Sequence, residues 1–93
     1  MFYYLFDVTV TIKSEENQNT YREDYLIEYP DGTEKKFVEA DAEYIMNGFA
    51  DACGAEFCRE FSAENVDVQT DLDAYMLTEE EYNRYKESNE EGE

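Results

Sequence analysis

The chain has 93 residues, and 25 Asp and Glu against seven Lys and Arg give it a formal net charge of −18. Such an acidic chain is unsuited to direct binding of nucleic acid or anionic lipid, since both need basic side chains. Because the chain has no histidine, a Cys-His nucleophile pair is excluded. Its 42% hydrophobic and 16% aromatic residues are typical of a folded domain. We therefore expect a single acidic domain over residues 1–88 and a frayed acidic tail over 89–93.

The first third of the chain predicts antiparallel strands. Apolar even-numbered residues alternate with mostly polar ones over residues 2–13, so we expect a strand whose even positions face the core. A polar loop over 14–20 leads to a second predicted strand over 21–29. A tight turn is expected at 30–33, where proline and glycine occur, and a short third strand at 34–39.

The middle of the chain predicts one long helix over about Asp41 to Phe61, with Asp41 as its N-cap. Apolar residues recur there every three or four positions, as expected for a helix that lies across a sheet. Gly48 and Gly54 lower the helix propensity, and we attribute both to close contact between the helix and the sheet. The stripe consists of Ala42, Ile45, Met46, Phe49, Ala52, Cys53, Phe57 and Phe61.

The last third predicts a fourth strand over 65–73 and a short acidic helix from Thr78 through about Ser88, opened by a capping box. The predicted fold class is therefore α+β. It combines an antiparallel sheet of three to four strands, one main amphipathic helix on one face, and a short C-terminal acidic helix. The predicted order is β-β-β-α-β-α.

The start of the chain lacks the cationic region of a signal peptide, and no apolar run reaches the length of a membrane span. We therefore expect a soluble, cytoplasmic protein. Cys53 and Cys58 fit that compartment as free, buried thiols, because two positions on one helix that point in different directions do not easily form a disulfide.

The acids of the last third form the main candidate site. Asp67, Asp71 and Asp73 are expected on one strand face with alternate side chains about 6.5–7 Å apart, continued by Glu79, Glu80 and Glu81 on the next helix. Such a row of fixed charges imitates a phosphate backbone, although a solvated strand face is the simpler alternative. A second group, Glu15, Glu16, Glu23 and Asp24, flanks the first loop and either extends this row or lies at another edge.

The tyrosines divide into two predicted groups. Tyr4, Tyr21 and Tyr25 are expected to face the core. Exposed tyrosines among carboxylates indicate a recognition surface, because tyrosine buries area at low entropic cost. The residues expected in this second group are Tyr3, Tyr75, Tyr82 and Tyr85.

Metal and enzyme motifs fail at diagnostic positions. The segment from Asp67 to Asp71 opens like a calcium loop, but Leu72 replaces the required glycine and Thr78 the closing glutamate. The acidic residues leave open only a weak, nonspecific site for divalent metal ions. The four glycines are scattered, so no phosphate-binding loop is present. We expect no catalytic residues, no metal and no cofactor.

In size, charge and the acids at 67–73 and 79–81, the chain resembles the small acidic DNA-mimic inhibitors of phages and mobile elements, which act against CRISPR and restriction systems. The resemblance implies that the protein occupies the cationic nucleic-acid channel of a defence nuclease, or the arginines that read a short DNA signal such as a PAM. If the chain is phage-encoded, the expected compartment is the cytoplasm of the host cell. Two alternatives stay open: an immunity or antitoxin-like inhibitor of a basic toxin, and an acidic adaptor or virion component in which charge serves solubility.

Overall fold

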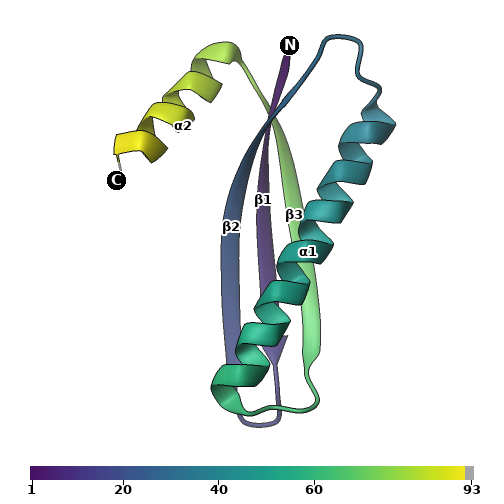
Figure 1. The fold of residues 1–93 in the computed structure, drawn as a ribbon, viewed down its shortest axis with the longest axis vertical. Helices are drawn as coiled ribbons and strands as arrows, with labels where there is room; N and C mark the ends of the chain where they lie inside the picture. Colours follow the sequence, from purple (N-terminus) through teal and green to yellow (C-terminus); the bar gives the residue numbers. More distant parts are fainter. Residues whose placement is uncertain (92–93) are drawn as a thin grey trace.

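The computed structural model describes residues 1–91 as a three-stranded antiparallel sheet with a long helix across one face (Figure 1). The predicted α+β class and antiparallel sheet are confirmed. The sheet order is β2-β1-β3, so the first strand is central. The elements in chain order are β1 (Phe2–Lys13), β2 (Gln18–Tyr29), α1 (Lys35–Phe61), β3 (Asp67–Leu77) and α2 (Glu79–Glu91).

The core lies between α1 and the even-numbered face of β1, as the alternation predicts. Phe6, Val8, Val10 and Ile12 are fully buried, and Phe57 of α1 is fully buried against the same face. Partly buried side chains surround them: Tyr4 of β1 itself, and Tyr21, Tyr25, Ile27 and Leu72 of the neighbouring strands. The three tyrosines expected in the core therefore pack against it.

The prediction of a third strand at 34–39 is wrong, because these residues form the first turns of α1. Val38 continues the apolar stripe of the helix one turn before Ala42, and it is buried with Phe6 and Tyr29. Two adjacent apolar residues do not distinguish a strand from a helix turn, whereas the longer stripe does. The order is therefore β-β-α-β-α, and the sheet has the lower of the predicted numbers of strands.

Asp41 is not the N-cap of α1. That position belongs to Glu34, whose side chain makes no capping hydrogen bond. Asp41 instead accepts a hydrogen bond of 3.0 Å from the hydroxyl of Tyr29, which fastens the helix to the end of β2. Burial and this hydrogen bond raise the pKa of Tyr29 to about 12.

The turn predicted at 30–33 is confirmed, since the Thr33 amide donates to the Pro30 carbonyl at 3.2 Å and Gly32 has a φ of 89°.

The prediction that Gly48 and Gly54 allow close contact between the helix and the sheet is wrong. A Cβ atom at either position would meet no atom within 4 Å, so neither glycine is required by packing.

The C-terminal part of the chain begins with a confirmed capping box. The Glu81 amide donates to the Thr78 hydroxyl and the Thr78 amide to the Glu81 carboxylate, each at 3.1 Å. α2 starts at the end of the sheet and runs off to the side of β2 (Figure 1). It continues to Glu91 rather than ending near Ser88. The tail predicted at 89–93 falls partly on residues 92–93, which lie outside the described residues, and its fraying stays a prediction.

Candidate functional site: an acidic open face of the sheet

The face of the sheet opposite α1 is the candidate site. Residues that pair directly across antiparallel strands share a face, so the odd-numbered residues of β1 and their partners lie together there. We call this surface the open face. It contains six acidic and two basic residues. Its members are Tyr3, Leu5, Asp7, Thr9, Thr11 and Lys13 of β1; Gln18, Thr20, Arg22, Asp24, Leu26 and Glu28 of β2; and Asp67, Gln69, Asp71, Asp73, Tyr75 and Leu77 of β3.

The predicted row of aspartates is confirmed in its geometry. Asp67, Asp71 and Asp73 are exposed and lie on the open face, in register with Lys13, Thr9 and Asp7 respectively. Because β3 is an outer strand of the sheet, these carboxylates follow its edge at intervals set by about 3.4 Å per residue. The row is therefore regularly spaced and accessible.

A second line of carboxylates crosses the sheet at right angles to this row. Asp24, Asp7 and Asp73 are direct partners on the three strands. Asp7 is held by Arg22, whose Nη2 lies 2.6 Å from one carboxylate oxygen and whose Nε lies 3.4 Å from the other. This contact lowers the pKa of Asp7, whereas desolvation and the charge of Asp7 raise the pKa of Asp24. The crossing line thus carries more negative charge than Arg22 neutralises.

The three glutamates at 79–81 have separate roles. Glu81 is engaged in the capping box, and the backbone and hydroxyl of Thr78 lower its pKa. Glu80 forms an i,i+4 ion pair with Arg84 at 3.3 Å. Only Glu79 extends the open face, since it lies near enough to Tyr3 to contribute to the raised pKa of that phenol, after partial burial.

Aromatic side chains join α2 to this end of the open face. The rings of Tyr3 and Tyr82 stack with centroids 4.5 Å apart. The carboxylate of Glu28, the partner of Tyr3 on β2, raises the pKa of Tyr82. Tyr75 and Tyr85 are exposed, as expected for an interface. Tyr3 and Tyr82 are half-buried because they pack on one another.

The second predicted group of acids does not form one patch. Asp24 belongs to the open face, but Glu23 is opposite Val8 and lies on the α1 side of the sheet. Glu15 and Glu16 lie in the β1–β2 turn, at the end of the sheet far from α2. Only Asp24 of this group therefore joins the crossing line of carboxylates.

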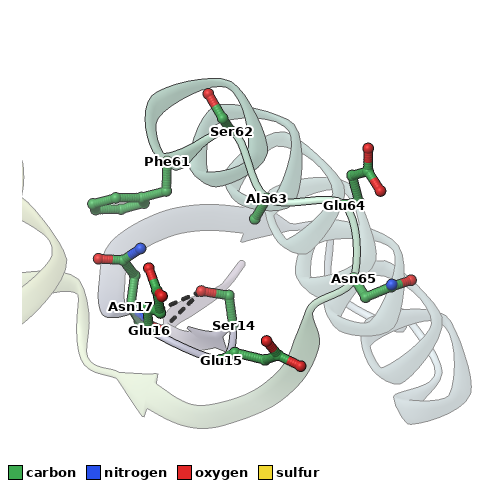
Figure 2. A pocket seen from close by; sticks show the side chains of 9 residues that line it. All are labelled: Ser14, Glu15, Glu16, Asn17, Phe61, Ser62, Ala63, Glu64 and Asn65. Carbon is green, nitrogen blue, oxygen red and sulfur yellow. Dashed lines mark hydrogen bonds between the residues drawn. The ribbon is translucent and has the colours of Figure 1, made fainter.

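A cleft of about 360 Å³ separates that turn from the loop between α1 and β3 (Figure 2). The Glu16 and Asn17 side chains point toward Phe61 across it, whereas Glu64 and Asn65 point away. The Ser14 hydroxyl accepts a hydrogen bond from the backbone amide of Asn17 at 3.1 Å, within the β1–β2 turn. Glu16 thus supplies one inward carboxylate to the cleft.

Sequence reasoning missed Asp7, Glu28 and Arg22 as members of the site. Asp7 interrupts an otherwise apolar segment, which is a usable signal, but its neighbours across the sheet depend on the strand register. Acids also cover the outer side of α1, where Glu39, Glu43, Asp51, Glu56 and Glu60 are all exposed. Exposed rings occur on α1 as well, at Phe37 and Tyr44. The open face differs from that surface because strand pairing orders its carboxylates into rows on a broad sheet surface.

Three further observations concern metal ions, thiols and membrane spans. No group of three or more Cys, Asp or Glu side chains among the described residues is arranged to hold a metal ion. Cys53 is buried, Cys58 is half-buried, and both are free thiols. Neither helix, over the part of the chain that the structure describes, has the length and apolarity of a membrane span.

No family model, curated protein or solved structure matches the chain.

Proposed function

We propose that the chain is a binding protein whose open face docks on the cationic nucleic-acid site of a protein partner and competes there with DNA or RNA. The partner we favour is a defence nuclease complex of a host cell, as in the anti-CRISPR and anti-restriction inhibitors. The proposed role is occupation of a site and involves no catalysis.

The observation that carries the proposal is the arrangement of carboxylates on the open face. Asp67, Asp71 and Asp73 follow one edge of the sheet, while Asp7 and Asp24 continue from Asp73 across it. Strand geometry holds these charges at fixed positions, so their alignment with a cationic groove costs little side-chain entropy. Fixed charges of one sign on a broad surface steer an oppositely charged partner and speed its association.

The shape of the molecule supports the same role. The chain is flat, with principal extents of 46, 33 and 15 Å, and α1 occupies only one face of the sheet. A thin body with one acidic broad face suits insertion into a channel that normally holds a nucleic-acid strand. Charge alone would not select a face, since α1 is acidic as well.

The test compares two variants that lose the same charge from opposite sides of the molecule. One carries Asp67→Asn, Asp71→Asn and Asp73→Asn on the open face. The matched control carries Glu39→Gln, Glu43→Gln and Asp51→Asn, which are exposed on α1. Each tagged protein is used to capture partners from a lysate of its source cells at about 50 mM and about 500 mM salt, concentrations that bracket the range over which surface charges become screened.

We expect the unmodified chain and the α1 variant to capture a nucleic-acid-binding protein at low salt and to release it at high salt or on addition of DNA or RNA. The open-face variant is expected to lose that partner. Equal loss in both variants would show that net charge, rather than the open face, drives binding. Partners that are indifferent to salt and nucleic acid would contradict the proposed function and favour an adaptor role.

A further inference from the structure

The open face places an accessible aromatic ring directly beside the crossing line of carboxylates. Tyr75 is in register with Leu5 and Leu26, and the next row along the strands on this face contains Asp73, Asp7 and Asp24. Tyr75 is 48% exposed, so part of its ring is available to a partner. Side chains two residues apart on a strand lie about 6.5–7 Å from one another on the same face. One flat cationic group can therefore reach both the Tyr75 ring and the Asp73 carboxylate.

This combination favours arginine over lysine. A guanidinium is planar, stacks on an aromatic face and donates two parallel hydrogen bonds to a carboxylate. A lysine ammonium is compact and strongly hydrated, and it lacks both the stacking surface and the fork of donors. Arginine and lysine carry the same charge, but a carboxylate next to an exposed phenol ring thus binds arginine in preference to lysine.

The chain already binds one guanidinium on this face. Both Nε and Nη2 of Arg22 lie within hydrogen-bond distance of Asp7, and the Tyr75 phenol adds a smaller contribution to the raised pKa of Arg22 after Asp7. Arg22, whose strand partner is Thr9, thus reaches along the face to the carboxylate of Asp7 in the next row. Among the described residues, no ion pair is present at Asp24 or Asp73. The carboxylates on either side of Asp7 are therefore available to a second cation.

We propose, on the basis of the proposed function, that Asp73 and Tyr75 form an arginine-binding subsite for the protein partner. The partner's guanidinium stacks on the Tyr75 ring and donates to the Asp73 carboxylate, while Asp24 adds long-range attraction across the sheet. The occupant is an arginine of a cationic protein surface, such as one that contacts phosphates or base edges of a nucleic acid.

The test uses two labelled peptides, nona-arginine and nona-lysine, and measures their affinities by fluorescence anisotropy at low salt. Arginine binds carboxylates better than lysine on many acidic surfaces, so the informative quantity is the change in the arginine-to-lysine affinity ratio between variants. Tyr75→Leu removes the aromatic face but keeps an apolar side chain, and Tyr75→Phe keeps the ring without the hydroxyl. Tyr44→Leu is the matched control, because Tyr44 is 81% exposed on α1.

We expect Tyr75→Leu to lower the arginine-to-lysine ratio about two- to fivefold, the factor that a cation–π contact contributes at an exposed site. Tyr75→Phe and Tyr44→Leu should leave the ratio unchanged, and Asp73→Asn should weaken both peptides and lower the ratio. Circular dichroism of each variant checks that the fold is retained.

Two failures are distinguishable. If Tyr75→Leu leaves the ratio unchanged while Asp73→Asn weakens both peptides, cationic docking on the open face stands and the arginine subsite is wrong. If neither peptide is weakened by Asp73→Asn, but both are weakened by the α1 charge variant, both the subsite and the proposed function are wrong.

Discussion

Replacement of Phe57 by alanine tests whether the packing of α1 on the sheet holds the open face together. Phe57 has no exposed surface, and its ring lies 4.7 Å from that of Phe61 while it packs with Val8 and Val10. Loss of a fully buried phenylalanine costs about 3–5 kcal/mol of unfolding free energy, because it removes transfer energy and leaves a cavity. A domain of this size has only about 5–15 kcal/mol in total. We therefore expect Phe57→Ala to remove a large part of the stability.

Urea unfolding followed by circular dichroism is the appropriate assay. Guanidinium chloride is a salt, and it would screen the repulsion among the acids while it denatures the chain. Phe37→Ala is the control, since Phe37 lies on the same helix but is 55% exposed and should change the unfolding free energy by less than about 0.5 kcal/mol. A loss below about 1 kcal/mol for Phe57→Ala would show that α1 does not pack on the sheet as described.

Three further predictions concern charge and backbone. Arg22→Gln should destabilise the fold more than Arg84→Gln in urea at pH 7, because Asp7, the partner of Arg22, is only 15% exposed whereas Glu80, the partner of Arg84, is 84% exposed. Since the pKa of Asp7 is lowered in the fold, its stabilisation is present above the unfolded carboxylate pKa of about 4 and lost as pH falls, so the effect of Arg22→Gln should shrink toward pH 3; an effect independent of pH would contradict this assignment. Gly48→Ala should raise the unfolding free energy by about 1 kcal/mol, because the added methyl group meets open space in a helix; destabilisation would indicate a hidden packing role. Ser62→Gly should be stabilising or neutral in the same assay, because Ser62 has a φ of 52°, and a loss of stability would show that its side chain matters more than its backbone strain.

Much of the fold was predictable because its patterns are long. The alternation from Phe2 to Ile12 and the apolar stripe from Ala42 to Phe61 each extend over several repeats. The structure confirms both faces except at Ala52, which is exposed. The segment 34–39 was not predictable in the same way, since Phe37 and Val38 alone fit either a strand or a helix turn. The capping box at Thr78 succeeded because its chemistry is local.

The candidate site was only partly predictable, because membership of a face depends on strand register. The row Asp67, Asp71 and Asp73 follows from alternation within one strand. The line that joins Asp73 to Asp7 and Asp24 requires the pairing of β1 with both neighbours, which no local pattern specifies. For the same reason, adjacent residues such as Glu23 and Asp24 were grouped by sequence although they lie on opposite faces of the sheet.

The most direct test of the central claim is a photo-crosslinking experiment with the crosslinker placed at Thr9, in the middle of the open face, or at Tyr44 on α1. The proposed docking predicts that the Thr9 position, but not the Tyr44 position, crosslinks to a nucleic-acid-binding protein in a lysate of the source cells, and that added DNA or RNA suppresses the product. Crosslinks that arise only from Tyr44, or that persist unchanged with excess nucleic acid, would contradict it.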